Sequence, residues 1–203
     1  MINATKIACL LIILTFMIPK NALAQSVSNT FSVDLRKYIG LWYEAARTTN
    51  EFQDNIVTKN GEQFAACYNS TATYNLEAPD QIGVRNTCVR RSKKGTILND
   101  GVRGRAAVQP GTRGQKLKIA FGSGVARFFQ KAISGGGFDY WIYCIGPVNA
   151  KGLYDWAVVS GEKKDYLFIL TRDKKISNAK RNKILSCARS NNLPVNQLLF
   201  RQR

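Results

Sequence analysis

The stretch that decides the fold runs from Tyr38 to Arg47 and reads Tyr-Ile-Gly-Leu-Trp-Tyr-Glu-Ala-Ala-Arg. Its central part, Ile39 to Ala46, is apolar and aromatic and favours a β-strand. Gly40 lies near the start of the run, and Trp42 follows two residues later. We therefore expect the first strand of a β-sheet protein here.

Seven further β-rich runs follow, separated by turn residues such as Glu77-Ala78-Pro79-Asp80 and Pro110-Gly111. They are Gln63–Leu76, Ile82–Arg91, Val102–Gln109, Gln115–Phe121, Phe138–Ile145, Leu153–Ser160 and Tyr166–Thr171. Eight consecutive strands with hairpin-length turns predict an up-and-down β-barrel, which has no exposed sheet edges and can hold one small ligand. The pattern alone leaves a β-sandwich open as the alternative.

A helix is predicted after the last of these strands. Ser177 is a typical N-cap residue, and Asn191, Asn192 and Pro194 end the helix. Helical spacing gathers four residues on one apolar face: Ile184, Leu185, Cys187 and Ala188. The run from Leu198 to Phe200 is a candidate for a short final strand.

The first 24 residues predict a cleaved secretory signal peptide. A polar start ending in Lys6 precedes an apolar run from Ile7 to Pro19, and Ala22-x-Ala24 has the small-x-small pattern of a cleavage site. The alternative is a membrane anchor, but the run is about thirteen residues long and a span needs roughly twenty. Cys9 lies at the start of the run rather than after it, so we expect no lipoprotein anchor. The mature chain, residues 25–203, should be one domain that is periplasmic or secreted.

The composition is strongly basic, with 30 Lys and Arg against 13 Asp and Glu and a formal net charge of +17. This charge favours anionic partners, either membrane lipid or lipopolysaccharide, or it only keeps the protein soluble. An exported protein rarely meets nucleic acid, which we do not expect as a partner. The chain has no histidine, the commonest general base and zinc ligand. We expect no metal and no cofactor.

Three motifs in order resemble the signature of the lipocalin family, most closely the bacterial lipocalins and apolipoprotein D. Gly40-x-Trp42 resembles the first motif, Tyr154-Asp155-Trp156 the second, of which the aspartate fits best, and Tyr166 to Arg172 the third. The resemblance covers roughly residues 33 to 200. It implies an eight-stranded barrel with one C-terminal helix packed outside. It also implies that Gly40, Trp42, Asp155 and Arg172 form a barrel-closing motif, in which the guanidinium packs on the indole.

The resemblance, together with strand alternation, suggests which side chains line the barrel. Phe168 shares a face with Arg172, and Trp141 shares one with Tyr143. We expect Tyr74, Trp141, Tyr143 and Phe168 to line a ligand cavity. Aromatic walls with a few hydroxyls suit an elongated apolar ligand with a polar head. The alternative is that these residues simply fill a packed barrel.

Four cysteines follow the signal peptide, and an even count in an exported chain predicts disulfides. Cys67 and Cys88 lie on either side of the turn at Glu77–Asp80, near enough for a cross-strand bridge. Cys144 is expected to point outward, and in the family the helix packs against that part of the barrel. The expected bridges are therefore Cys67–Cys88 and Cys144–Cys187.

The expected function is a carrier for one fatty acid or lysophospholipid. The alternative is a basic protein that binds membrane or lipopolysaccharide surfaces without a dedicated small ligand. An enzyme is not expected, because every mature cysteine has a plausible partner and no serine has a histidine base. The stretch between Gly122 and Gly137 carries five apolar residues at helical spacing, Val125, Phe128, Phe129, Ala132 and Ile133, with Arg127 and Lys131 between them. It is either a membrane-docking loop or a lid that folds onto the barrel.

Overall fold

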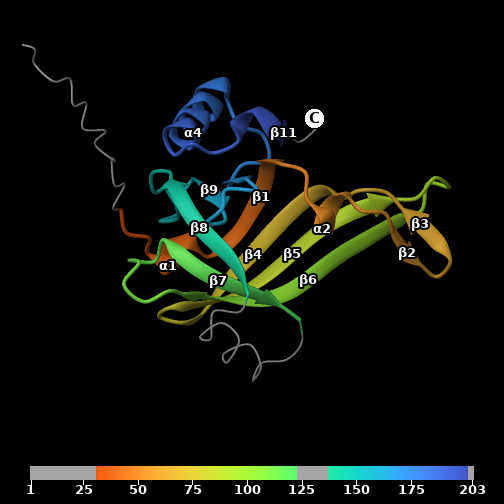
Figure 1. The fold of residues 1–203 in the computed structure, drawn as a ribbon, viewed down its shortest axis with the longest axis horizontal. Helices are drawn as coiled ribbons and strands as arrows, with labels where there is room; N and C mark the ends of the chain where they lie inside the picture. The colour runs from red at the N-terminus through yellow and green to blue at the C-terminus, as the bar shows by residue number, and fades with distance from the viewer. Residues whose placement is uncertain (1–30, 123–136, 201–203) are drawn as a thin grey trace, which may run out of the picture.

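The computed structural model describes residues 31–122 and 137–200, which form a β-barrel with a helix against its outside (Figure 1). All barrel strands pair antiparallel in chain order, and β1 pairs with both β4 and β10, which closes the sheet. The eight barrel strands of the described residues are β1 (Gly40–Arg47), β4 (Tyr68–Ala78), β5 (Gln81–Arg91), β6 (Ile97–Val108), β7 (Lys116–Phe121), β8 (Phe138–Ile145), β9 (Trp156–Ser160) and β10 (Phe168–Thr171). The predicted up-and-down barrel is confirmed.

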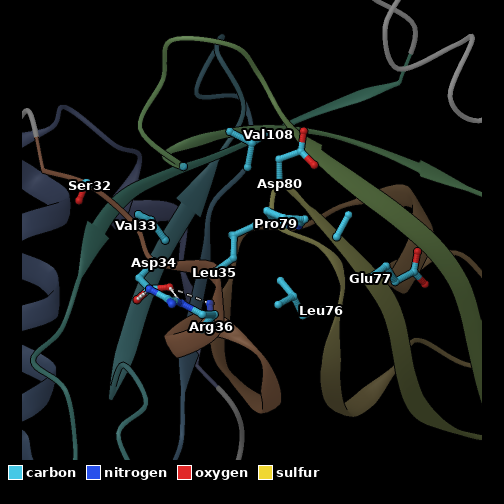
Figure 2. Close-up of a pocket in the computed structure, with 12 residues that line it drawn as sticks. Ser32, Val33, Asp34, Leu35, Arg36, Leu76, Glu77, Pro79, Asp80 and Val108 are labelled. Carbon is cyan, nitrogen blue, oxygen red and sulfur yellow. Dashed lines mark hydrogen bonds and ion pairs between the residues drawn. The ribbon is translucent and has the colours of Figure 1, made fainter.

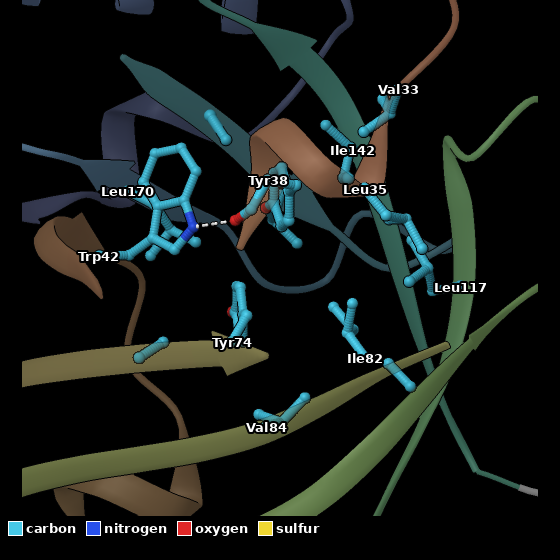
Figure 3. Close-up of a cluster of buried hydrophobic side chains, with 14 of the residues drawn as sticks. Val33, Leu35, Tyr38, Trp42, Tyr74, Ile82, Val84, Leu117, Ile142 and Leu170 are labelled. Atoms are coloured by element: carbon cyan, nitrogen blue, oxygen red, sulfur yellow. Dashed lines mark hydrogen bonds between the residues drawn. The ribbon is translucent and has the colours of Figure 1, made fainter. Parts of the chain in front are cut away.

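The inner face of the barrel is set by strand alternation. Tyr74 lies opposite Val84, and Leu117 lies opposite Tyr140. These residues belong to one apolar cluster inside the barrel, together with Trp42 and Ile142. Figure 3 shows its side chains converging from α1 (Leu35–Tyr38) and the surrounding strands. Burying one large apolar side chain contributes roughly 1.5–3 kcal/mol, so this cluster is a main source of stability.

A second apolar cluster lies between the outside of the barrel and α4 (Asn178–Ser190). The Ser177 side chain accepts a hydrogen bond from the Lys180 amide, which confirms the predicted N-cap. The buried helix residues are Ile184, Leu185 and Ala188. They pack against outward-facing residues of β9 and β10, such as Val158 and Ile169. Helix and barrel therefore share one hydrophobic interface.

The two disulfides pair as expected. Cys67 and Cys88 bridge with their Cα atoms 5.5 Å apart, and Cys144 and Cys187 bridge at 6.3 Å. The second bridge ties α4 to β8, and Lys180 adds an ion pair of 2.8 Å to Asp155. A native disulfide typically contributes about 2–4 kcal/mol, so α4 is firmly held to the barrel. A short β11 (Leu199–Phe200) also forms, pairing with the end of β1.

The predicted run Gln63–Leu76 is divided in the structure. A separate hairpin, β2 (Val57–Lys59) and β3 (Glu62–Phe64), precedes β4. Its turn is Asn60-Gly61, with φ of 52° and 75°, the two positive values that this two-residue turn requires. This hairpin and the short α2 (Glu51–Asp54) lie at the end of the barrel where β1 finishes, which we call the mouth. The opposite end, covered by α1, is the base (Figure 1).

The remaining described element lies after the C-terminal helix. A 3₁₀ turn, η1 (Val195–Gln197), joins α4 to β11. In the described ranges no helix combines the length and the apolar character needed to cross a bilayer. The signal peptide expected at residues 1–24 lies outside the described residues.

Candidate ligand-binding site

The base of the barrel is sealed by Trp42 and Arg172. Trp42 is fully buried, and its indole Nε1 donates a 2.8 Å hydrogen bond to the Tyr38 carbonyl. The Arg172 guanidinium lies 3.5 Å from the centre of the indole ring. It also donates to the carbonyls of Leu41 at 2.7 Å and Ile39 at 2.8 Å. Burial lowers the pKa of Arg172 to about 10, so the side chain is still charged at neutral pH and acts as a structural cation.

Gly40 and Asp155 have different relations to this seal. Gly40 has a φ of 89°, and a Cβ there would lie 3.4 Å from Arg172 Nη1, so glycine suits both the backbone and the space. The Asp155 carboxylate pairs instead with Lys180 and connects the barrel to α4. The structure thus gathers Gly40, Trp42 and Arg172 at the base, whereas the side chain of Asp155 forms an ion pair with Lys180 of α4.

The predicted cavity residues divide into two groups. Tyr74 and Phe168 belong to the cluster inside the barrel, as expected. Trp141 lies opposite Lys116 on the outer face of β8, and the Lys116 ammonium sits 3.5 Å from its ring centre. Tyr143 packs beside Trp141 and against the outer cluster. The expectation that Trp141 and Tyr143 face the interior is therefore wrong.

A β-bulge explains this difference. The register between β8 and β9 shifts between Ile142 and Cys144. Cys144 does face outward as predicted, but the bulge leaves Tyr143 on the same outer side, and Ile142 faces inward. Strict alternation from Cys144 would place Trp141 and Tyr143 inside. The bulge reverses that assignment for the part of β8 nearer the mouth.

Three tyrosine hydroxyls meet inside the barrel, and we call them the tyrosine triad. Tyr140 Oη lies 2.8 Å from Tyr38 Oη and 2.9 Å from Tyr74 Oη. The rings of Tyr38 and Tyr74 are stacked, with centroids 5.6 Å apart. Burial raises the pKa of Tyr74 to about 12 and raises the pKa values of Tyr38 and Tyr140 well above the usual range. The triad is therefore a neutral group of hydrogen-bond donors and acceptors.

The mouth is organised by a buried arginine. Arg90 is 2% exposed and donates to Asp100 at 2.7 Å. Its guanidinium also donates to four backbone carbonyls of the segment that holds α2 and the β2–β3 hairpin: Phe52 at 2.9 Å, Gln53 at 3.4 Å, Asn55 at 2.9 Å and Ala65 at 3.1 Å. Arg90 thus holds these connections against β5 and β6.

Aromatic side chains gather at the same end. The rings of Phe52 and Phe138 meet edge to face at 5.6 Å, and Phe121 lies 6.4 Å from Phe138. Phe52 is 70% exposed and Phe138 is 52% exposed. The mouth therefore exposes apolar side chains, while the base is closed by Trp42 and Arg172.

A hollow of about 800 Å³ lies at the base, between α1 and the β4–β5 turn (Figure 2). Leu76 and Val108 form part of its wall, and Asp34 and Glu77 lie at its rim. Asp34 is already paired with Arg36, and Glu77 with Arg105. The hollow is therefore a polar-rimmed surface feature at the end of the barrel opposite the mouth.

One group of potential metal ligands also lies near the mouth. Cys67, Cys88 and Asp100 bring their ligand atoms within 4.8 Å of one another. Because the two sulfurs are joined in a disulfide, neither is a thiolate, the form in which cysteine binds metals. The arrangement is suited to a structural bridge.

Three important residues were missed by the sequence reasoning: Tyr38, Tyr140 and Arg90. Arg90 had a usable signal, since it follows Ile82 and Val84 at even spacing on β5, which places it on the inner face. Tyr140 required knowledge of the β8 bulge. Tyr38 lies before the first strand, where no periodicity predicts its direction. The residues expected to dock on a membrane, Arg127, Phe128, Phe129 and Lys131, lie outside the described residues.

Comparison with known proteins agrees with this architecture. A family model described as a lipocalin-like domain matches residues 33–203. A lipocalin of Acanthamoeba polyphaga mimivirus is 28% identical over 175 residues, covering 86% of this chain and 88% of the relative. The outer membrane lipoprotein Blc of Citrobacter freundii is 26% identical, covering 86% and 81%.

Solved structures show the same fold. Lobster apocrustacyanin A1 superposes with a TM-score of 0.53 at 14% identity, covering 81% of this chain and 77% of that one. The fold, the sealed base and the family match over nearly the whole described chain lead to one conclusion. The chain belongs to the lipocalin family.

Proposed function

We propose that this protein is an extracytoplasmic carrier that holds one fatty acid or lysophospholipid inside its barrel, for lipid storage, transport or membrane maintenance. Lipocalins typically hold one small hydrophobic ligand in their eight-stranded barrel. The observation that carries the proposal is the contrast between the two ends of the barrel. The base is closed by Trp42 and Arg172, and the mouth exposes Phe52 and Phe138.

The inner surface supports a ligand of this kind. Phe168, Tyr140 and Phe121 pack against the inner cluster and stay only partly buried. Their rings provide apolar contact for an acyl chain, and the triad provides polar atoms near the base. The bulk of the inner wall is aliphatic, with Leu117, Ile119 and Ile142 as members.

An extracytoplasmic location agrees with the cysteines. The two disulfides join cysteines that are 21 and 43 residues apart, and such bridges persist in oxidising compartments. They also leave all four cysteines outside residues 1–24 without a free thiol, and the chain has no histidine. Binding rather than catalysis is therefore the proposed activity.

Replacing Phe168 by glutamate is expected to weaken fatty acid binding by about tenfold or more, because the ligand would share the barrel with an unpaired carboxylate. Phe168 lies opposite Val159 on the inner wall. Displacement of a fluorescent fatty acid analogue measures the effect. The matched control is Trp141→Glu on the outer face, where the new carboxylate lies beside Lys116. If both variants fold and lose fatty acid affinity equally, or if neither loses affinity, the result would argue against an interior site.

A second proposed role is docking on an anionic membrane leaflet through Arg127, Phe128, Phe129 and Lys131. The exposed Phe52–Phe138 pair favours it, because Phe138 follows this segment closely in the sequence. The excess of Lys and Arg over Asp and Glu, 30 against 13 in the full chain, would assist, since each basic residue near an anionic surface contributes about 1 kcal/mol.

Vesicle co-sedimentation tests the docking role. The wild type should sediment with anionic vesicles, and the double variant Phe128→Ser, Phe129→Ser should remain in solution. A double variant at the base, Leu41→Ser with Val148→Ser, is the control, because these residues are 43% and 46% exposed. If the loop variant sediments like the wild type at low and moderate salt, the loop is not a membrane anchor.

A further inference from the structure

The tyrosine triad holds one more proton than its internal hydrogen bonds use. Tyr38, Tyr74 and Tyr140 share two hydrogen bonds, with Tyr140 in the middle. Three hydroxyls carry three protons, so one O–H group has no acceptor among the described residues. Tyr38 is 0% exposed and Tyr74 is 5% exposed. A buried donor without an acceptor is unfavourable, and an entering oxygen atom would satisfy it.

The cationic side chain at the base, Arg172, already has hydrogen-bond acceptors of its own. Arg172 donates to the carbonyls of Ile39, Leu41 and Tyr154 and packs on Trp42. At the mouth, Arg90 and Arg47 are paired with Asp100 and Asp54. A carboxylate carried down to the triad would therefore be a buried charge without a free counterion, which is strongly unfavourable. A neutral oxygen avoids this cost.

A second polar atom on the inner wall points to the same kind of ligand. Asn86 lies opposite Ala72 of the inner cluster, one inner position nearer the mouth than Val84, which lies opposite Tyr74. Its side-chain oxygen is buried and has no hydrogen-bond partner among the described residues. Two residues along a strand span about 7 Å. The inner wall thus has an O–H donor without an acceptor at the triad. It also has an acceptor without a donor, the side-chain oxygen of Asn86, one inner strand position nearer the mouth.

We propose that the inner end of the barrel recognises an uncharged oxygen atom, a hydroxyl or carbonyl, on the end of the ligand that enters first. This inference rests on the proposed carrier function and narrows its ligand class. The preferred ligand is an acyl chain oxygenated at its far end, with the carboxylate left at the mouth. The triad donates to the oxygen, and the apolar inner wall covers the chain.

Three acids of equal chain length separate the alternatives. Hexadecanoic acid ends in a methyl group, 16-hydroxyhexadecanoic acid ends in a neutral hydroxyl, and hexadecanedioic acid ends in a second carboxylate. Isothermal titration of the wild-type protein should show the hydroxy acid binding about tenfold or more tightly than the diacid. Equal or tighter binding of the diacid overturns the inference. Failure of all three to bind saturably overturns the carrier function itself.

The triple variant Tyr38→Phe, Tyr74→Phe, Tyr140→Phe tests the triad directly, because it removes all three hydroxyls and with them the unpaired proton. It should weaken binding of the hydroxy acid by about tenfold and leave binding of hexadecanoic acid nearly unchanged. The matched control is Tyr143→Phe, which removes a hydroxyl from the outer face of the same strand. Equal weakening for both acids, or no change for either, contradicts recognition by the triad. If the triple variant does not fold, the wild-type comparison of hydroxy acid and diacid decides the question.

Discussion

Replacing Trp42 by alanine is expected to lower the free energy of unfolding by about 3–5 kcal/mol. The fully buried indole fills the base of the barrel and bonds to the Tyr38 carbonyl. Its loss also removes the ring against which Arg172 packs, a contact worth about 0.5–2 kcal/mol. Urea unfolding followed by far-UV circular dichroism measures the change.

Trp141→Ala is the matched control for this experiment. Trp141 is partly buried on the outer face, and its indole nitrogen has no hydrogen-bond partner among the described residues. Trp141→Ala should therefore lower the free energy of unfolding clearly less than Trp42→Ala does. A larger loss at position 141 than at position 42 would contradict the assignment of the base seal.

Replacing Arg90 by methionine is expected to release the connections at the mouth. The change removes the donors that serve the carbonyls of Phe52, Asn55 and Ala65 and leaves Asp100 without its partner. Leaving buried acceptors unsatisfied costs about 1–3 kcal/mol for each fully buried group. Hydrogen exchange monitored by mass spectrometry should show faster exchange across residues 50–66, with little change in β8 and β9.

Arg91→Met is the control, since Arg91 is the exposed neighbour on β5. It should leave exchange in residues 50–66 unchanged. If Arg90→Met and Arg91→Met give the same protection as the wild type, Arg90 does not hold the mouth. Uniformly faster exchange over the whole chain would instead indicate a global structural role.

Much of the scaffold follows from local sequence signals. Turn residues and β-rich runs placed the eight barrel strands, and Ser177 with the apolar face at Ile184 placed the helix. Hairpin symmetry made the Cys67–Cys88 pairing accessible. The Cys144–Cys187 pairing also needed the family resemblance, which places the helix outside that part of the barrel. The strand, turn and helix signals are short in range or repeat along the chain, so a single sequence carries them.

The candidate binding site was harder to predict from the sequence than the scaffold, because it depends on strand register. One extra residue in β8 moved Trp141 and Tyr143 to the outer face and brought Tyr140 inside. No composition or motif marks that bulge. The triad also joins residues more than 60 positions apart in sequence, as with Tyr74 and Tyr140. The Asn60-Gly61 turn, by contrast, was a visible hairpin signal that the strand prediction overlooked.

The central claim is that an acyl chain lies inside the barrel, and magnetic resonance of the labelled protein with one equivalent of hexadecanoic acid tests it most directly. Intermolecular nuclear Overhauser effects should connect the acyl chain to methyl groups of the inner wall, such as Ile119 and Ile142. Methyl groups beneath the helix, such as Ile169 and Ile184, should show none. Contacts confined to these outer methyl groups, or no contacts at saturating ligand, would contradict the account.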